Sequence, residues 1–287
     1  MSILKKVLIV FTILVVLVAS LAFDAFYSAP SRFTVRYETL ESIYIPEGLS
    51  DTSILFFSDL KYGPFMKEQR LQKLVQAINN LSPDVVIFGG DLFADDYKPS
   101  EDDKNIVKTT LKEICAPLGK FAVLGDTDQE TLDDMGTNKG LLYEADFEVL
   151  DNKSISIRNF GSDSITLVGL QNSVNGYVDI TTAYENISRS SFTIAICHTP
   201  DTAKDVPTDL TKYFLAGHSL GGQVYYGLGS LYTPLKADYY FKGKHTVNDS
   251  VTLDITSGTG TVIKDVRFLS NAEIVLYRLK RKSIMAD

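Results

Sequence analysis

Residues 53–61 of this 287-residue chain read SILFFSDLK, a short and mostly apolar run followed almost at once by an aspartate. A short apolar run bounded by polar residues is typical of a strand that is buried on both faces. Other apolar runs end in the same way and are followed by Asp91, Asp126, His198 and His218. In layered α/β folds the carboxyl ends of the strands meet at one edge, so these side chains are expected to converge there.

The rest of the body alternates between strand and helix patterns. The first half predicts strands at residues 53–57, 84–88 and 121–124 and helices at 67–80 and 105–114. The second half predicts shorter strands at 155–158, 165–170, 192–197, 213–216 and 274–279, with one helix at 180–188. Two mixed sheets packed face to face with helices outside, in a single α/β domain, fit this order better than one doubly wound sheet.

The N-terminus indicates a membrane location. Lys5 and Lys6 precede an apolar run over residues 7–23, which is near the lower limit of about 17 to 25 residues for a membrane-spanning helix. Because basic flanking residues stay in the cytoplasm, we expect a single-pass signal-anchor in the cell membrane with the domain on the extracytoplasmic side. The small residues Ser20 and Ala22, at a spacing that suits a cleavage site, leave a cleaved signal peptide as the alternative. The expected divisions are an anchor at 1–26, a lead-in segment at 27–52 and a domain at 53–287.

The charge balance argues against one class of partner. The chain carries 36 acidic and 28 basic residues, a net charge of −8, and its Lys and Arg residues do not cluster. Nucleic-acid binding requires a basic patch or stripe, so no nucleic acid is expected as a partner. The composition leaves the oligomeric state open.

Five segments carry acidic and histidine residues in a fixed order. They are Ser58-Asp59-Leu60-Lys61, Gly89-Gly90-Asp91, Gly125-Asp126-Thr127-Asp128, Cys197-His198-Thr199-Pro200-Asp201 and Gly217-His218-Ser219-Leu220-Gly221-Gly222-Gln223. Over about residues 53–278 this order resembles the calcineurin-like metallophosphoesterase family, in particular its small membrane-anchored bacterial members. The resemblance implies a four-layer α/β/β/α sandwich and metal-dependent hydrolysis of phosphoesters.

The resemblance also implies a metal site with several ligands replaced. In the family, the ligands of one metal fall at the positions of Asp59, Lys61, Asp91 and Leu220, so two of these four positions cannot ligate here. The ligands of the other metal fall at the positions of Asp91, Asp126, His198 and His218, all of which can ligate. The sequence therefore predicts one divalent transition metal ion (Mn, Fe or Zn), with two as the alternative, and the Lys61 ammonium in place of the missing ion.

These replacements alter the expected chemistry. Three aspartates, one divalent ion and Lys61 sum to zero, whereas the family pattern has a surplus of positive charge that attracts phosphate. The family's histidine beside the leaving group corresponds to Thr127, which cannot supply a proton near neutral pH. We take Asp59, Lys61 and Asp128 as the catalytic candidates, and Asp128 could instead orient its loop. Asp59 is also a candidate metal ligand, with Asp91, Asp126, His198 and His218. The expected activity is weakened or altered hydrolysis of a phosphate-containing small molecule or lipid, and the alternative is an inactive binding protein of the cell envelope.

A remote alternative is a serine esterase. Residues 217–221 also match Gly-X-Ser-X-Gly, the nucleophile elbow of α/β-hydrolases, with Ser219 as the nucleophile. That mechanism needs a helix directly after the serine and a histidine later in the chain. The residues that follow are poor helix formers, and the only later histidine is His245.

Overall fold

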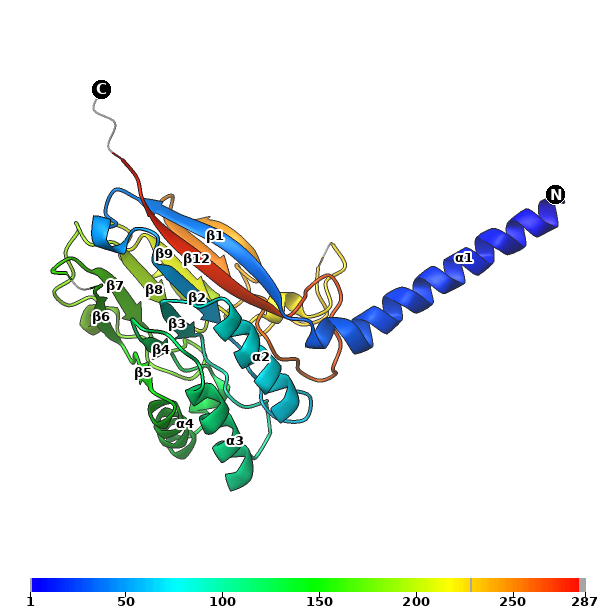
Figure 1. Ribbon diagram of the computed structural model, residues 1–287, viewed down its shortest axis with the longest axis horizontal. Coiled ribbons are helices and arrows are strands. Elements are labelled where there is room, and N and C mark those ends of the chain that lie inside the picture. Colours follow the sequence, from blue (N-terminus) through cyan, green and yellow to red (C-terminus); the bar gives the residue numbers. More distant parts are fainter. Residues whose placement is uncertain (1, 160, 228, 284–287) are drawn as a thin grey trace.

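The computed structural model describes residues 2–159, 161–227 and 229–283, and within these residues it forms two six-stranded sheets (Figure 1). The first sheet has the order β1 (Thr34–Ser42), β12 (Glu273–Arg281), β2 (Ser53–Phe57), β3 (Val85–Phe88), β4 (Lys120–Ala122) and β5 (Phe147–Val149). The second has the order β10 (Gly243–Val247), β11 (Val251–Ile255), β9 (Tyr213–Ala216), β8 (Thr193–Ile196), β7 (Ile165–Gly169) and β6 (Lys153–Ile157). Both sheets mix parallel and antiparallel pairs, which confirms the expected class.

Helices cover the outer faces of the two sheets. The first sheet is covered by α2 (Glu68–Asn80), α3 (Glu101–Lys112) and α4 (Leu132–Glu144), which lie together on one side of the molecule (Figure 1). The second sheet is covered by the short helix α5 (Ile180–Ala183) and the 3-10 helix η5 (Pro200–Lys204). The four-layer sandwich is therefore confirmed, with a thin fourth layer.

The strand β2 shows why its sequence is apolar without interruption. Leu55 and Phe57 pack against the helices, whereas Ile54 and Phe56 face the core between the two sheets. Successive side chains of a strand point to opposite faces, so a strand between two layers buries both sets. Burying each such side chain stabilises the fold by about 1.5–3 kcal/mol.

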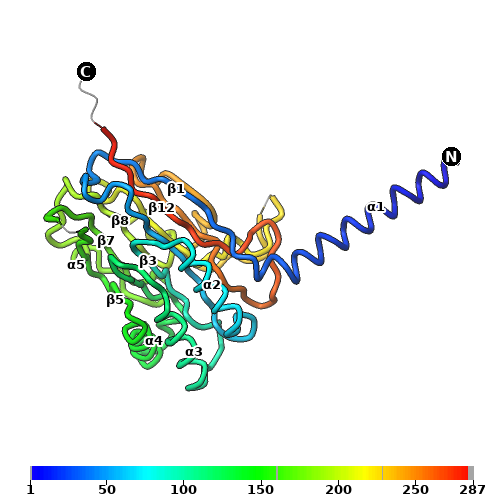
Figure 2. The backbone as a smooth tube through the Cα atoms, viewed as in Figure 1, coloured from blue at the N-terminus to red at the C-terminus, as the bar shows by residue number. Residues whose placement is uncertain are grey.

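The two ends of the described domain lie side by side. β1 pairs in parallel with β12 over nine residues, from Thr34 opposite Glu273 to Ser42 opposite Arg281. Figure 2 shows the blue β1 beside the red β12 at one edge of the molecule. Part of the expected lead-in at residues 27–52 therefore supplies an edge strand of the first sheet.

The helix α1 (Ile3–Phe23) projects away from the two sheets (Figure 1), and every one of its residues is exposed. Its 21 residues span about 31 Å at 1.5 Å per residue, which matches a hydrocarbon layer of about 30 Å. A π-helical turn, η1 (Asp24–Ser28), and a 3-10 turn, η2 (Ala29–Ser31), connect it to β1. The chain thus carries one helix long and apolar enough to cross a membrane.

Several elements differ from the sequence-based expectation. Helix α5 stops at Ala183 instead of continuing to residue 188, and Asn186 adopts a left-handed φ of 63° that ends helical backbone. Helix α4 was not expected because Gly136 and Gly140 weaken both its propensity and its pattern. It is stabilised at its start by Thr131, whose side chain accepts a hydrogen bond from the Asp134 N–H at 3.1 Å. The strands β5, β10 and β11 were also not expected.

Candidate metal centre

Five parallel strands from the two sheets end at one place. β2, β3 and β4 are neighbours in the first sheet, and β8 and β9 are neighbours in the second. Two hydrogen bonds join the loops that follow them: the His198 ring to the Gly89 carbonyl oxygen at 2.6 Å, and the His218 N–H to Asp59 Oδ2 at 3.0 Å. The structure therefore brings together the motif residues that lie far apart in the sequence.

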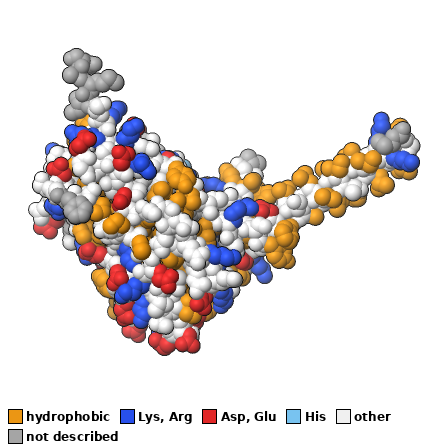
Figure 3. All heavy atoms as spheres, in the orientation of Figure 1, with side chains coloured by type: hydrophobic (Ala, Val, Ile, Leu, Met, Phe, Trp, Pro, Cys, Tyr) orange, Lys and Arg blue, Asp and Glu red, His pale blue; other side chains and the backbone are white. Residues whose placement is uncertain are grey.

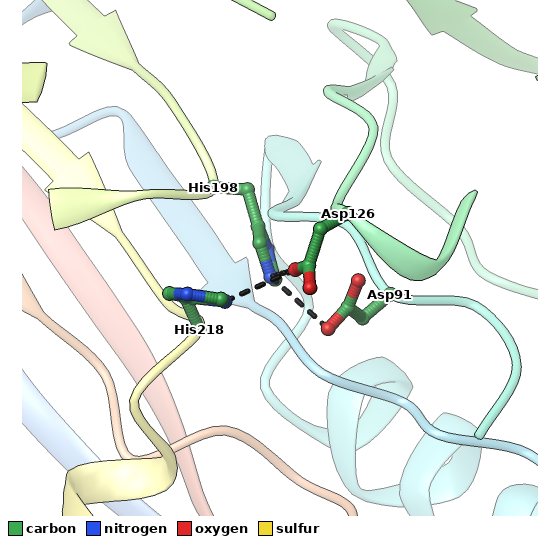
Figure 4. A group of neighbouring side chains, drawn as sticks. All are labelled: Asp91, Asp126, His198 and His218. Atoms are coloured by element: carbon green, nitrogen blue, oxygen red, sulfur yellow. Dashed lines mark ion pairs between the residues drawn. The ribbon is translucent and has the colours of Figure 1, made fainter. Parts of the chain in front are cut away.

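Four side chains from these loops point toward a common centre (Figure 4). They are Asp91, Asp126, His198 and His218, and one ligand atom of each lies within 4.8 Å of the others. Nε2 of His198 is 3.1 Å from Asp91 Oδ2 and 3.3 Å from Asp126 Oδ1. Nδ1 of His218 is 3.1 Å from the same Asp126 oxygen. A set of two carboxylates and two imidazoles suits a divalent transition metal ion.

The two histidine rings are held with a lone pair facing this centre. The outer nitrogen of His198, Nδ1, donates to the Gly89 carbonyl, and the outer nitrogen of His218, Nε2, donates to the Leu235 carbonyl at 2.7 Å. A carbonyl oxygen only accepts, so in each ring the proton sits on the outer nitrogen and the inner nitrogen is free to ligate. Backbone carbonyls that fix the tautomer in this way are typical partners of metal-binding histidines.

The inner atoms of the cluster fit a cation. Asp126 Oδ1 and His198 Nε2 are buried, and neither has a hydrogen-bond partner among the described residues. Asp91 Oδ2 is also buried and lies 2.7 Å from the Lys61 ammonium. A buried polar atom without a partner costs about 1–3 kcal/mol, so the two unpartnered atoms at one point fit a shared cation. A divalent ion would satisfy both together with Asp91 and His218.

The pKa values of the cluster residues also favour a cation at this centre. Burial alone would raise the pKa of Asp91 and Asp126, but the adjacent His198 outweighs it and lowers both pKa values below the ordinary range. Burial alone would lower the pKa of His198, but Asp91 and Asp126 raise it well above the ordinary value. The centre thus favours a positive charge at His198 Nε2, and a metal ion would take the place of the proton there.

Lys61 and Asp59 lie beside this cluster. The Lys61 ammonium is 2.7 Å from Asp91 Oδ2 and also pairs with Asp95, and only 3% of its side chain is exposed. Burial alone would lower the pKa of Lys61, but Asp91 and Asp95 raise it well above the ordinary value, so the side chain is charged. Asp59 is fully buried, and its Oδ1 lies 4.0 Å from His198 Nε2 without a hydrogen-bond partner among the described residues. Burial raises the pKa of Asp59.

The backbone is adapted to this arrangement. Asp59, Asp91 and His218 have left-handed φ values of 55°, 64° and 71°. Such conformations cost about 1–3 kcal/mol each and concentrate at functional sites. Two glycines allow the loops to approach: a Cβ at Gly125 would lie 2.0 Å from Asp91 Oδ1, and one at Gly217 would lie 2.1 Å from Ser58 Oγ.

Asp128 and Thr127 lie behind the ligand atoms. The two carboxylate oxygens of Asp128 accept hydrogen bonds from the N–H groups of Asp91, Leu92 and Gly125 at 2.7–2.9 Å. Burial and the neighbouring Asp91 raise the pKa of Asp128 to about 6. The Thr127 hydroxyl donates to Asp91 Oδ1 at 2.9 Å. Both side chains therefore fix the loop that carries Asp91.

Two residues of the centre had no sequence signal. Asp95 pairs with Lys61 across 34 positions of sequence, and Leu235 contributes only its backbone carbonyl to His218. Asp95 sits beside another aspartate in a loop, where acidic residues are usually solvated. A backbone carbonyl is common to every residue type, so no side-chain pattern marks Leu235.

The segment around Ser219 does not form a nucleophile elbow. Ser219 is buried and is followed by a three-residue 3-10 turn, η6 (Leu220–Gly222), where the elbow needs a helix. The Ser219 hydroxyl accepts from the Gly221 N–H at 3.2 Å. His245, the later histidine, contacts the Lys242 carbonyl at 3.0 Å instead.

Comparisons with known proteins agree with the resemblance to metallophosphoesterases. None of the models of known protein families matches the chain. The chain is 27% identical over 258 residues to YkuE of Bacillus subtilis, named an uncharacterized metallophosphoesterase, and covers 88% of each chain. It is 27% identical over 250 residues to a zebrafish (Danio rerio) transmembrane protein with metallophosphoesterase domain, covering 83% of this chain and 55% of that one. It is also 25% identical over 220 residues to the UDP-2,3-diacylglucosamine pyrophosphatase LpxG of Chlamydia muridarum, covering 60% of this chain and 64% of that one.

Two facing sheets with a carboxylate and histidine cluster at their strand ends are the arrangement that the resemblance to calcineurin-like metallophosphoesterases implies. The chain is similar to proteins named as metallophosphoesterases, one of them a transmembrane protein, and it carries one N-terminal helix long and apolar enough to cross a membrane.

Proposed function

We propose that the protein is a membrane-anchored hydrolase that cleaves a phosphoester with one divalent metal ion. The ion would be Mn, Fe or Zn, held by Asp91, Asp126, His198 and His218. The observation that carries this proposal is the group of buried ligand atoms that lack partners within one cluster. When bound, such an ion supplies Lewis acidity toward a phosphoryl oxygen and lowers the pKa of water.

The residues around the ion have separate roles in this proposal. Lys61 replaces the second metal ion of the family as a fixed positive charge beside Asp91 and the phosphate. Asp59 supplies a carboxylate oxygen, Oδ1, that lies 4.0 Å from His198 Nε2 and has no hydrogen-bond partner among the described residues. Asp128 positions Asp91 and its loop through three backbone hydrogen bonds. Thr127 occupies the position of the family's histidine, and its hydroxyl is hydrogen-bonded to Asp91. Because this side chain cannot donate a proton to the leaving group near neutral pH, turnover is expected to be slow.

The proposed location and substrate follow from the N-terminal helix and the relatives. We place the anchor at residues 1–26 in the cell membrane, with the lead-in at 27–52 and the domain at 53–287 on the extracytoplasmic side. The LpxG relative is named a UDP-2,3-diacylglucosamine pyrophosphatase, so its name describes action on the pyrophosphate of a diacylated sugar nucleotide. A phospholipid or another phosphate-containing component of the envelope is therefore the proposed substrate class.

Metal content is the first test. The full chain, purified in detergent without chelator, should carry one transition metal ion per chain by elemental mass spectrometry. Two ions would show that other residues replace the lost ligands and would overturn the one-metal proposal. A chain without metal, and with none taken up on addition of Mn or Zn, would favour a fold retained for binding.

Activity is the second test. Hydrolysis of phosphomonoesters, phosphodiesters and nucleotide-linked lipids should be abolished by chelators and by His218→Ala, because the ring is a ligand. Ser219→Ala is the matched control one residue away and should retain activity. Activity lost in Ser219→Ala but resistant to chelators would favour the serine esterase. No turnover of any of these esters above the His218→Ala background would favour the binding protein.

The role of Lys61 has its own test. The double variant Lys61→His with Leu220→His restores histidines at the two replaced positions and should take up a second ion per chain. An unchanged stoichiometry in the folded double variant would refute the idea that Lys61 stands in the place of a metal.

A further inference from the structure

Exposed apolar side chains gather on two loops next to the base of α1. We define residues 224–227 with 229–242 as the first rim loop and residues 262–269 as the second rim loop. The first exposes Tyr226, Leu231, Leu235 and Tyr239, and the second exposes Ile263 and Leu269. Leu231 and Ile263 are 76% and 78% exposed. In Figure 3 hydrophobic side chains continue from α1 onto its junction with the domain, with basic side chains among them. Exposed apolar patches with a polar margin mark surfaces that bind a partner or a membrane.

The second rim loop is fixed to the segment that leaves α1. The Arg267 N–H donates to the Ala25 carbonyl at 2.9 Å. The Arg70 guanidinium donates to the Pro30 carbonyl and also to Asp265 at 3.0 Å. Ala25 and Pro30 are themselves buried. The junction is therefore a docked segment, and it sets the position of the second rim loop relative to the end of α1.

The length of α1 sets the depth of that junction. With Lys5 and Lys6 at the cytoplasmic side, the apolar residues 7–23 extend about 26 Å across about 30 Å of hydrocarbon, so residues 24–27 lie at its outer boundary with the lipid headgroups. Phe26 and Tyr27 are exposed there, and aromatic side chains are enriched at this depth. A loop hydrogen-bonded to Ala25 must then lie at the same level, where its apolar side chains reach the acyl chains.

The first rim loop forms part of the wall of the candidate metal centre. The Leu235 carbonyl holds the His218 ring, while the Leu235 side chain is 72% exposed on the outside of the same loop. Exposed Lys236 and Lys264 lie within the two loops and can meet lipid phosphates. One loop thus contacts the metal centre on its inner side and offers apolar and basic side chains on its outer side.

We propose that the two rim loops insert into the outer layer of the membrane that α1 crosses, so that the metal centre opens at the lipid surface. The partner is the bilayer itself, bound through apolar side chains at the boundary of the acyl chains and through lysines at the phosphates. This inference rests on the proposed membrane insertion of α1 and does not depend on hydrolysis.

The chain contains no tryptophan, so the fluorescence of a single introduced tryptophan reports the surroundings of that one side chain. We would reconstitute full-length Leu231→Trp and Ile263→Trp into phosphatidylcholine and phosphatidylglycerol vesicles, with and without brominated acyl chains. Insertion by ~5–10 Å predicts a shift of emission to shorter wavelength and a roughly two-fold loss of intensity in brominated vesicles. Leu132→Trp, at an equally exposed position on α4, is the matched control and should show neither effect.

Leu14→Trp within α1 shows whether the anchor itself is inserted, and unchanged metal content shows that each variant is folded. Quenching at Leu14→Trp without quenching at both rim positions would overturn the proposal. A shift of tryptophan emission to shorter wavelength without quenching by brominated acyl chains would also overturn the proposal. The loops would then be covered by protein, for example by a second copy of the chain. No quenching at Leu14→Trp would remove the membrane insertion on which the inference rests, whatever the outcome of the hydrolysis assays.

Discussion

Exchanging Asp126 for asparagine tests the metal centre with the smallest change of shape. Asp126 Oδ1 is the oxygen that lies near both histidines, at 3.3 Å and 3.1 Å. The charges of Asp59, Asp91, Asp126 and Lys61 sum to −2, which one divalent ion neutralises. The Asp126→Asn substitution changes this sum to −1, so the ion is held by one negative charge fewer. An amide oxygen can still ligate, and asparagine is the residue of the resembling family at this position.

The expected loss of affinity follows from Coulomb's law. The ligand atoms lie within 4.8 Å of one another, so a charge and an ion among them are separated by about 4 Å or less. At about 4 Å a unit charge and a divalent ion attract by about 2 kcal/mol in bulk water and by about 8 kcal/mol at an effective dielectric constant of about 20. Even the smaller value corresponds to about a 30-fold rise in Kd.

Calorimetric titration of Mn²⁺ into the metal-free full chain in detergent measures this directly. Asp126→Asn should keep the stoichiometry of the unaltered chain and raise Kd at least about 30-fold. Asp96→Asn makes the same charge change at an exposed position outside the cluster and should leave Kd within a few-fold. Equal affinity in Asp126→Asn and the unaltered chain would refute the reasoning that the negative charge of Asp126 holds the ion, and with it the proposed charge balance of the metal centre.

Three further predictions concern stability. Arg267→Met should lower the free energy of unfolding by about 3 kcal/mol or more, because the buried guanidinium donates hydrogen bonds to six loop carbonyls. Chemical denaturation measures this free energy. Arg278→Met, at an exposed position, is the control and should change it little. Ser100→Ala removes the capping box of α3 and should cost about 1 kcal/mol in the same assay, and a loss near zero would contradict the cap. Burial alone would raise the pKa of Glu38, but the ion pair with Lys244 outweighs burial and lowers this pKa below its ordinary value of 4.5. Its ionised form therefore stabilises the fold above that pH and the effect is lost as pH falls, so Glu38→Gln should show a flatter fall of the thermal midpoint in acid.

Much of the layered fold can be predicted from local patterns. The strands β2 and β9 were predicted at their observed bounds, and α2 differs from its predicted range by one residue. Fully buried strands carry continuous apolar runs, and an amphipathic helix repeats its apolar residues every three to four positions. The edge strand β10 escaped prediction because its sequence is largely polar and it is held by pairing with its neighbour β11.

The sequence by itself determined the order of the five motifs, the side chains able to hold a metal, and the apolar N-terminal helix. Each of these depends on residue type and on spacing along the chain. Only the tertiary structure decided that Lys61 pairs with both Asp91 and Asp95, and that the Leu235 carbonyl fixes the His218 ring. It alone placed the rim loops against the segment that leaves α1. The physical reason is that these contacts join segments distant in sequence, and their distances are set by how the two sheets and their loops pack together.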